Sequence, residues 1–531
     1  MNPRVRDFLL LAGFCVFLFF YGSAQFGLVG ADEPRYAQIA REMLDRHEWI
    51  TPILGGEAWL EKPPLYYWQA MVAYKMFGVH DWSARLPSAV DASLIVLAVY
   101  LFMRKLRPGF HLDAALMTAS AAGLVGFAHA ASTDMPLASM FCLAMLCWYA
   151  WWETSQRLYL AAFYFFLGLA ALAKGPVAIV LAGIVIALFA VAAANSRFIV
   201  RTLWLPGMIL FLVVALPWYL ALQVRHPEFF RLFILEHNLA RFGTDLYHHA
   251  APFWYYLPVT ALALVPWTVF AAASVVEIVR RWWRQRKALL ASEEALNLYL
   301  ILWLIVPIVF FSLSRSKLPG YILPVIPAGT MLVAEYVRRH AAEYRLPVWL
   351  LGWHSVVAAA PLIPALMIAS LLSQRRLPSG VGTAVAAVIA LLIAIGMAVT
   401  LRSRLGLRLL YFVTLVPVLL AVAALIRIGA PVADRYLSAR PVAKQLSTIE
   451  TKPLPVAVLG VDREVEYGLA FYRNQIIRRY ELRQIPLQEH LLIAPEETAP
   501  AVAKFVGNRR VVYLGNFPPQ KLDLFWVKGS D

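Results

Sequence analysis

The sequence predicts a polytopic α-helical membrane protein with about 13 transmembrane helices, juxtamembrane amphipathic helices and a small C-terminal α/β domain. Of the 531 residues, 61% are hydrophobic and only 15% are charged, which excludes an ordinary soluble globule. The apolar residues form runs long enough to cross a bilayer at 1.5 Å per helical residue. The predicted spans cover residues 8–29, 82–103, 112–130, 136–152, 158–173, 176–194, 202–222, 255–279, 297–313, 319–337, 347–371, 381–400 and 407–429.

The basic residues between these spans predict their orientation. With the N-terminus in the cytoplasm, 19 Lys and Arg fall in cytoplasmic segments and five in the opposite short loops. The positive-inside rule then places the C-terminus on the outer side. Topology therefore accounts for the net charge of +16 without a nucleic-acid partner.

Three longer segments interrupt the pattern of spans, and all three fall on the outer side. They are a first loop over 30–81, a second loop over 223–254 and a tail over 430–531. The first loop repeats apolar residues at helical spacing from Tyr36 to Leu44, and a second helix is expected from Pro63 through Tyr74. Both are expected to lie along the membrane surface.

The tail differs in composition from the rest of the chain. Residues 456–459 and 511–514 are rich in Val and Leu and predict strands, with a helix over 465–472 between them. Residues 430–531 are therefore expected to form a small α/β domain that packs on a transmembrane domain of residues 1–429.

Charged and polar residues lie at the ends of spans on the outer side. Asp32 and Asp134 have an alternative role as helix N-caps, Lys174 as a snorkelling lysine, and Arg315 and Lys317 as interfacial anchors. Cations that recur on this side against the positive-inside trend favour an anionic ligand such as phosphate. The group comprises Asp32, Arg35, Glu61, Lys62, Asp134, Lys174, His248, His249, Arg315 and Lys317.

A metal site has weaker support. Glu61 and one of His248 and His249 are candidate ligands for zinc or magnesium, but two ligands fall short of the three or four of a usual zinc site. The chain shows no Walker loop, no GxGxxG turn and no Ser-His-Asp set. A nucleotide-sugar donor therefore has no visible pocket, which favours a lipid-phosphate donor.

Motifs spread over roughly the first 340 residues resemble those of the bacterial lipid A aminoarabinose transferases, which group with the protein O-mannosyltransferase-like C-type glycosyltransferases. One departure is Pro64-Leu65-Tyr66-Tyr67, where that family favours a small residue. The matching motifs are Asp32-Glu33-Pro34-Arg35-Tyr36-Ala37, Arg41-Glu42-Met43-Leu44, Glu61-Lys62-Pro63-Pro64 with Tyr67-Trp68, Asp134 before its proline, Leu172-Ala173-Lys174-Gly175, Glu236-His237 with Arg241-Phe242, His249 to Tyr256, and Ser316-Lys317-Leu318-Pro319 with Tyr321-Ile322-Leu323.

The resemblance implies roles for these residues. Asp32 would be the essential carboxylate and Asp134 a second functional acid. Glu61 and His249 would be associated with a divalent metal. The residues expected to bind the donor phosphate or line the cavity around it are Arg35, Lys62, Lys174, Arg315, Lys317 and Tyr321.

The expected function is that of an inverting glycosyltransferase of the bacterial inner membrane. It would move a sugar, with 4-amino-4-deoxy-L-arabinose as the candidate, from a polyprenyl phosphate to lipid A or another envelope acceptor on the periplasmic face. We expect a monomer in contact with the bilayer. The alternatives are a transporter or flippase of lipid-linked sugars, a protein O-glycosyltransferase of the same superfamily, and a non-catalytic assembly subunit.

Overall fold

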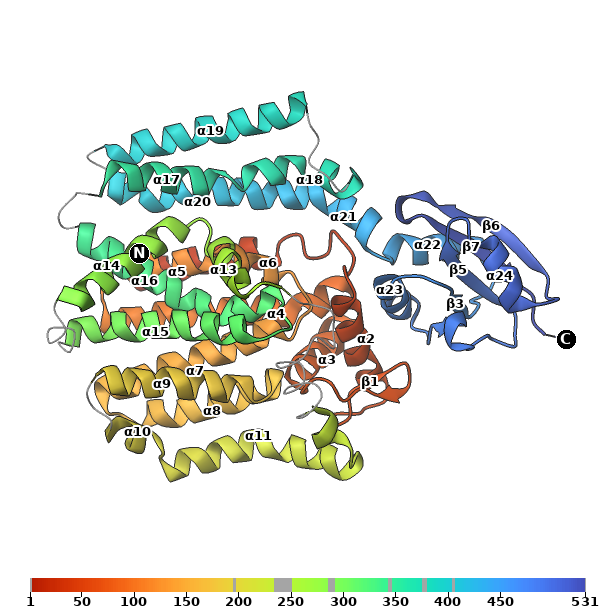
Figure 1. Cartoon of the computed structure of the whole chain (residues 1–531), viewed down its shortest axis with the longest axis horizontal. Helices are drawn as coiled ribbons and strands as arrows, with labels where there is room; N and C mark the ends of the chain where they lie inside the picture. The colour runs from red at the N-terminus through yellow and green to blue at the C-terminus, as the bar shows by residue number, and fades with distance from the viewer. Residues whose placement is uncertain are drawn as a thin grey trace.

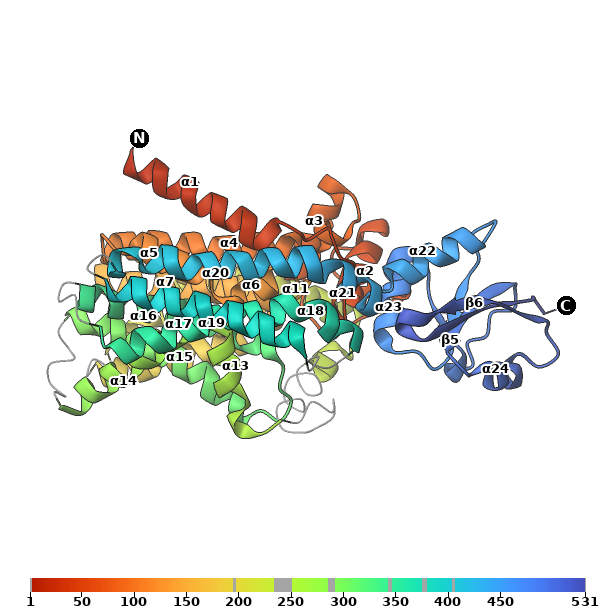
Figure 2. The same ribbon diagram turned by 90° about the horizontal axis from the view of Figure 1, so that it is seen from above.

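The computed structural model describes residues 2–193, 197–233, 251–284, 292–341, 346–374, 380–403 and 406–530. Long helices lie along the long axis of the molecule, and a small α/β domain stands at one end of this bundle (Figures 1 and 2). The helices α2 and α3 lie between the bundle and that domain. We call this end of the bundle the domain end.

The first half of the chain contributes most of the bundle. Its helices and short strands are α1 (Pro3–Cys15), η1 (Val16–Phe20), α2 (Asp32–Asp45), β1 (Ile53–Leu54), β2 (Glu57–Ala58), α3 (Leu65–Phe77), α4 (Asp81–Leu106), α5 (His111–Ala119), α6 (Ala122–Ala128), α7 (Asp134–Thr154), α8 (Arg157–Lys174), α9 (Val177–Ala192), α10 (Arg197–Thr202) and α11 (Leu205–Arg225).

The second half completes the bundle with a further set of helices. These are η3 (Phe253–Tyr255), α13 (Tyr256–Ala263), α14 (Thr268–Arg284), α15 (Ser292–Leu313), η5 (Pro319–Val325), α16 (Ile326–Ala341), α17 (Val348–Ala359), α18 (Leu362–Gln374), α19 (Val381–Arg402), α20 (Gly406–Ala424), η6 (Leu425–Gly429) and α21 (Ala430–Leu437).

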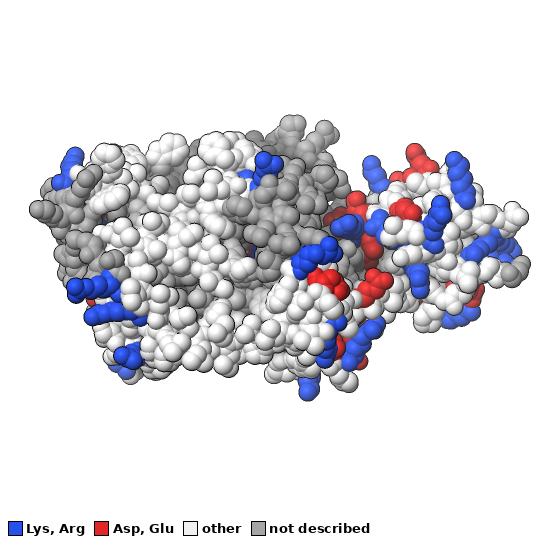
Figure 3. All heavy atoms as spheres, turned by 60° about the horizontal axis from the view of Figure 1, so that its bottom comes forward, with Lys and Arg blue, Asp and Glu red and all other residues white. Residues whose placement is uncertain are grey.

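The helices have the length and composition of membrane spans. In the described part of the chain, nine are long and apolar enough to cross a bilayer, or 11 if each of two bent pairs counts as one span. On the face in Figure 3, the charged side chains of the described residues lie mainly at the two ends, and the described surface between them is largely uncharged. The protein is therefore a multi-pass membrane protein.

Each of the 13 predicted spans corresponds to helical structure, but two of them are shorter than expected. The sixth is α9, of 16 residues. The first ends at Phe20 and not at residue 29, because residues 21–31 form a loop whose backbone carbonyls turn toward Arg85.

Two predicted spans are bent. The segment predicted as one helix over 255–279 breaks between α13 and α14 with a 118° bend, at a point where Pro266 cannot continue the helical hydrogen bonds. The pair α5 and α6 bends by 57°. The last span runs past the predicted end at 429, through η6 and α21, to Leu437.

The two helices predicted in the first loop are confirmed as α2 and α3, of which α2 is amphipathic and α3 is largely apolar. The apolar face of α2, including Tyr36, Ile39 and Met43, packs with the buried tyrosines of α3 in one hydrophobic cluster. Asp32 is the first residue of α2 and not its N-cap, since the cap is Ala31 and no side chain caps the helix. The alternative role of Asp32 as a helix cap is therefore wrong.

The C-terminal domain is a five-stranded sheet with helices, and the predicted strands and helix are confirmed as β3, β6 and α23. The strand order is β4-β3-β5-β7-β6, with β3 parallel to β4 and β5, and β7 antiparallel to β5 and β6. The elements are α22 (Arg440–Ile449), β3 (Val456–Val458), α23 (Arg463–Arg473), β4 (Arg478–Arg479), η7 (Tyr480–Leu482), β5 (His490–Pro495), α24 (Ala499–Val506), β6 (Val511–Phe517), η8 (Pro518–Gln520) and β7 (Leu522–Val527).

A buried ion pair joins α2 to α4 at the domain end. Arg85 is fully buried and donates to both oxygens of Glu33, with Nη2 to Oε2 at 2.7 Å and Nε to Oε1 at 3.2 Å. The other Arg85 hydrogen bonds reach the carbonyls of Ser23, Phe26 and Gly27 at 2.9 Å each. Glu33 also accepts the backbone N–H groups of Val29 and Ala131, both at 2.8 Å. The pair is therefore well satisfied and fixes the loop that leads to Asp32.

We expect Glu33→Gln to lower the free energy of unfolding by about 3–5 kcal/mol, because it leaves the Arg85 charge buried without its counterion. Thermal unfolding in detergent measures the change. Asp32→Asn is the matched control, since it neutralises the adjacent carboxylate, which is 57% exposed. A Glu33→Gln protein that melts with the wild type would contradict the structural role.

Candidate active site at the domain end

The predicted site residues in the described part of the chain come from five segments that meet at the domain end, one of which is the end of α8 with Lys174. Asp32 and Arg35 lie in the first turn of α2, while Glu61 and Lys62 precede α3. Asp134 begins α7, and Tyr321 lies in η5. Burial, the charge of Asp32 and then that of Asp134 raise the pKa of the Tyr36 hydroxyl, against the opposing effect of Arg35. The first turn of α2 and the start of α7 are thus close in space.

Arg35 lies in a cage of aromatic rings. Its guanidinium carbon is 5.1 Å from the ring centre of Tyr36, 5.3 Å from that of Trp59 and 5.8 Å from that of Tyr467. Its Nη2 donates to Asp32 Oδ1 at 2.5 Å. Burial opposes the charge of Arg35, but Tyr36, Asp32 and Glu61 outweigh it and raise its pKa above the usual value. Arg35 is therefore a fixed, permanent cation.

Polar groups in and next to this cage lack partners. Arg35 Nε, Trp59 Nε1 and the Tyr67 hydroxyl are buried and have no hydrogen-bond partner among the described residues. Each of the three can donate a hydrogen bond. A buried donor without a partner costs free energy, so these groups favour a ligand that brings acceptor oxygen atoms. The neighbouring Arg35 cation favours an anionic ligand of this kind.

A second cluster surrounds Asp134. The Lys174 ammonium donates to the Asp134 carboxylate and lies 4.3 Å from the ring centre of Tyr321. The Ser132 hydroxyl donates to Asp134 Oδ2 at 3.0 Å. A Cβ atom at Gly320 would lie 2.6 Å from that same oxygen, so only glycine allows η5 to come this close.

This geometry bears on the alternative roles of Asp134 and Lys174. Asp134 does not cap α7, whose N-cap is Thr133. Lys174 pairs with a carboxylate inside the protein and so is not a snorkelling lysine. An ion-paired Asp134 is a poor general base, and Lys174 must give up part of this pair to bind a phosphate.

The remaining predicted residues fall into three groups. Lys62 is close enough to Asp134, and Glu61 to Arg35, for their charges to interact. Lys317 is buried and its ammonium donates to the Ser314 carbonyl, whereas Arg315 is exposed. His248 and His249 lie outside the described residues. Within those residues, no three His, Cys, Asp or Glu side chains are grouped as in a metal centre.

Three residues of this site, Trp59, Arg85 and Tyr467, are not predicted by the sequence motifs. Trp59 had a weak signal, as an aromatic residue two positions before Glu61. Arg85 had a stronger one, since an arginine inside a predicted span is costly unless it has a role. Tyr467 had none, because it is distant in sequence and lies in the C-terminal domain.

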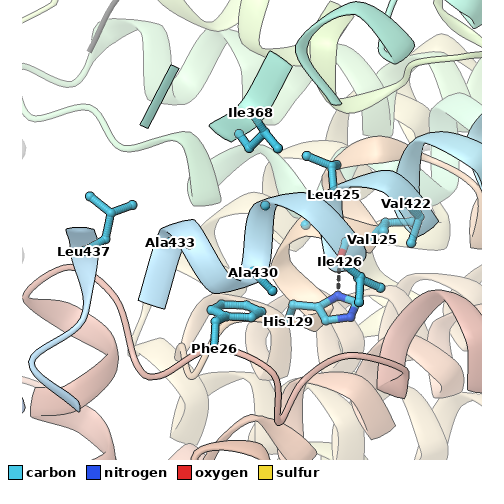
Figure 4. A pocket seen from close by; sticks show the side chains of 12 residues that line it. Phe26, Val125, His129, Ile368, Val422, Leu425, Ile426, Ala430, Ala433 and Leu437 are labelled. Atoms are coloured by element: carbon cyan, nitrogen blue, oxygen red, sulfur yellow. Dashed lines mark hydrogen bonds between the residues drawn. The ribbon is translucent and has the colours of Figure 1, made fainter. Parts of the chain in front are cut away.

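An apolar pocket of about 310 Å³ lies nearby, between α6, the loop before α2 and the end of the last span (Figure 4). Its one polar side chain is His129, with Nδ1 3.0 Å from the Val125 carbonyl oxygen and Nε2 3.2 Å from that of Tyr21. Among the described residues that line it, the pocket is otherwise apolar, so the charged cluster is the better candidate for the chemistry. The lining residues are Phe26, Val125, Gly126, His129, Ile368, Val422, Leu425, Ile426, Gly429, Ala430, Ala433 and Leu437.

The first part of the chain matches the model of a known protein family. Residues 5–233 match the model of the dolichyl-phosphate-mannose-protein mannosyltransferase family. The matched segment contains Asp32, Arg35, Lys62 and Asp134.

Comparison with individual proteins is more specific. The chain is similar to the undecaprenyl phosphate-alpha-4-amino-4-deoxy-L-arabinose arabinosyl transferase of Pseudomonas aeruginosa PAO1, with 32% identity over 347 residues, or 64% of this chain and 61% of the relative. The enzyme of that name from Serratia proteamaculans is 31% identical over 327 residues, or 60% and 57%. The chain thus matches about three fifths of the length of these relatives. The resemblance seen in the motifs is confirmed.

Solved structures show the same fold over nearly the whole chain. The crystal structure of ArnT from Cupriavidus metallidurans bound to undecaprenyl phosphate matches with a TM-score of 0.74 at 22% identity, covering 98% of this chain and 97% of that one. The Archaeoglobus fulgidus oligosaccharyltransferase matches with a TM-score of 0.51 at 14% identity, covering 89% of this chain and 64% of that one. The predicted fold class, a polytopic helical protein with a small C-terminal α/β domain, is confirmed.

Proposed function

We propose that this protein is an inverting membrane glycosyltransferase that takes a sugar from undecaprenyl phosphate or a related polyprenyl phosphate. The observation that carries the proposal is the caged Arg35 cation beside the exposed Asp32 carboxylate, with unpaired donors next to it. The relatives' names supply the candidate sugar, 4-amino-4-deoxy-L-arabinose. Lipid A or another envelope lipid is the proposed acceptor, on the periplasmic face of the bacterial inner membrane.

The reaction breaks the bond between the anomeric carbon of the sugar and the phosphate oxygen of the donor. The acceptor oxygen attacks that carbon from the opposite side, so the configuration inverts. Negative charge develops on the departing polyprenyl phosphate, and Arg35 and Lys62 stabilise it as preorganised cations. Lys174, Lys317 and Tyr321 complete the proposed phosphate cavity, and Arg315 attracts the anion from its exposed position.

The two carboxylates have different tasks in this scheme. Asp134 is engaged by Lys174 and Ser132, so it positions groups and does not take a proton. Asp32 is exposed on one side and is the candidate to orient the donor sugar. A lipid A phosphate is already an anionic nucleophile and needs no base, whereas with a hydroxyl acceptor Asp32 would also remove the proton.

A protein acceptor is the second candidate, favoured by the match to the protein mannosyltransferase family model. Mass spectrometry of envelope lipids and glycans from a deletion strain separates the two acceptors. Loss of a sugar from lipid A supports the first candidate, and loss from a glycoprotein supports the second. Loss of lipid-linked sugar from the outer leaflet, with the transferase activity intact, would indicate a flippase.

We expect Arg35→Ala and Lys62→Ala each to reduce transfer at least about 100-fold, because each removes a preorganised charge contact to the leaving phosphate. Transfer from a synthetic polyprenyl phosphate sugar by purified protein measures the effect. The matched control is Arg46→Ala, an exposed arginine at the end of the same helix α2. Normal turnover in either test variant would refute the phosphate assignment.

We also propose that Glu61 and His249 hold a divalent cation, zinc or magnesium. Elemental analysis of purified protein should find an ion that Glu61→Ala and His249→Ala both remove, since each supplies one ligand. Glu61 also lies near the Arg35 charge, so it has a competing role as an anionic neighbour of that cation. A metal-free wild type that stays active with chelators would favour this competing role.

The proposed orientation places the domain end in the periplasm. A cysteine at Glu57, the exposed first residue of β2, should react with an impermeant thiol reagent added to intact cells with a permeable outer membrane. One at Gln156, in the exposed α7–α8 connection, should react only after lysis. The native cysteines give little background, because two are buried and the third is partly buried. The reverse labelling pattern would overturn the topology and the donor assignment.

A further inference from the structure

We infer that the C-terminal domain contributes a residue to the active site, because Tyr467 of α23 contacts the Arg35 guanidinium and keeps it in position. This inference rests on the proposed function and extends it to a residue outside the transmembrane domain. Tyr467 is a positioning residue, since it touches the cation and not the reacting atoms.

Tyr467 supplies one wall of the aromatic cage around Arg35. The other two rings, Tyr36 and Trp59, belong to the first loop of the membrane domain. With the three rings in place, the Arg35 side chain is only 12% exposed. An arginine with a planar guanidinium stacks well on such rings, which restrict the directions in which its N–H groups point.

The salt bridge to Asp32 cannot set this orientation alone. Asp32 is 57% exposed, and ion pairs with an exposed partner are weak and easily exchanged. A bound phosphate also competes with Asp32 for the same guanidinium. The rings are uncharged and do not compete, so they keep Arg35 in place before and after the donor binds.

Tyr467 is held in place because α23 packs directly on α2. Phe471, one turn after Tyr467, belongs to the same buried cluster as Tyr36 and Met43. Arg41 Nη1 donates to the Phe471 carbonyl oxygen at 2.8 Å. These contacts fix both the distance between α23 and α2 and their register.

The same domain also holds the loop that leads to Asp32. Leu28 N–H donates to the hydroxyl of Tyr472, which follows Phe471 in α23, at 2.7 Å. Gly27 N–H donates at 2.8 Å to Oδ1 of Asp434 in α21, where the last span meets this domain. Arg440 links Asp434 to Asp81, at 2.9 and 2.8 Å. The C-terminal domain therefore braces both ends of the short segment that carries Asp32 and Arg35.

A double-mutant cycle tests the inference in the full-length protein. The four proteins are the wild type, Arg35→Ala, Tyr467→Ala and the double variant, assayed for transfer from a synthetic undecaprenyl phosphate sugar. We expect Tyr467→Ala to lower kcat/KM about tenfold, through loss of a partly buried cation–π contact. Tyr467→Phe keeps the ring and should stay within about twofold of the wild type. Tyr513→Ala, a tyrosine on the exposed face of β6, is the matched control.

The decisive result is the double variant. If Tyr467 acts through Arg35, then Tyr467→Ala costs nothing further in the Arg35→Ala background. Losses that multiply, or a Tyr467→Phe protein as impaired as Tyr467→Ala, would overturn the inference.

Thermal unfolding of the same four proteins separates this inference from the proposed function. Coupling between Arg35 and Tyr467 in both unfolding and transfer supports a positioning role. Coupling in unfolding together with additive losses in transfer shows a merely structural contact and overturns the inference. A wild-type protein that transfers no sugar refutes the proposed function. If, in addition, the effects of Arg35→Ala and Tyr467→Ala on thermal unfolding are additive, the contact between Arg35 and Tyr467 is refuted independently.

Discussion

The geometry of the site depends on the buried pair between Glu33 and Arg85. Its hydrogen bonds tie three stretches of chain together, namely the loop before α2, the start of α4 and the loop before α7. Asp32 directly precedes Glu33, and Asp134 follows Ala131 by three residues. One ion pair therefore sets the separation between the two candidate functional carboxylates, although neither belongs to it.

A buried ion pair is a costly way to hold three segments, because apolar side chains of similar volume often give equal or greater stability. Its advantage is a defined register. Hydrogen bonds of a guanidinium and a carboxylate form only at restricted angles. Here the Arg85 guanidinium donates to the carbonyls of Ser23, Phe26 and Gly27, and the Glu33 carboxylate accepts the N–H groups of Val29 and Ala131. An apolar contact would tolerate sliding by a residue, which would move Asp32 to the wrong face of the site.

The sequence predicted those features that depend on local periodicity. The helices α2 and α3, the strands β3 and β6 and the positions of the spans follow from apolar spacing that each segment carries within itself. The early end of the first span does not follow from local periodicity, because it is caused by the hydrogen bonds that Arg85 donates to backbone carbonyls of residues 23–27. The pairing of Asp134 with Lys174 and the contact of Tyr467 with Arg35 join distant segments, so no local pattern encodes them. Two of the cations predicted to bind phosphate, Arg35 and Lys174, are already paired with carboxylates within the protein.

That pairing determines how a phosphate can enter. Arg35 is held by Asp32 and Lys174 by Asp134, and the two pairs differ in exposure. The Lys174 pair is mostly buried, so separating it is expensive, whereas the Asp32 side of the other pair is open to solvent and exchanges readily. On the proposed function, an incoming donor phosphate therefore displaces Asp32 from Arg35 first. The exchange leaves the cation neutralised by phosphate and the Asp32 carboxylate free beside the sugar, so that donor binding itself prepares the carboxylate that orients the sugar for transfer.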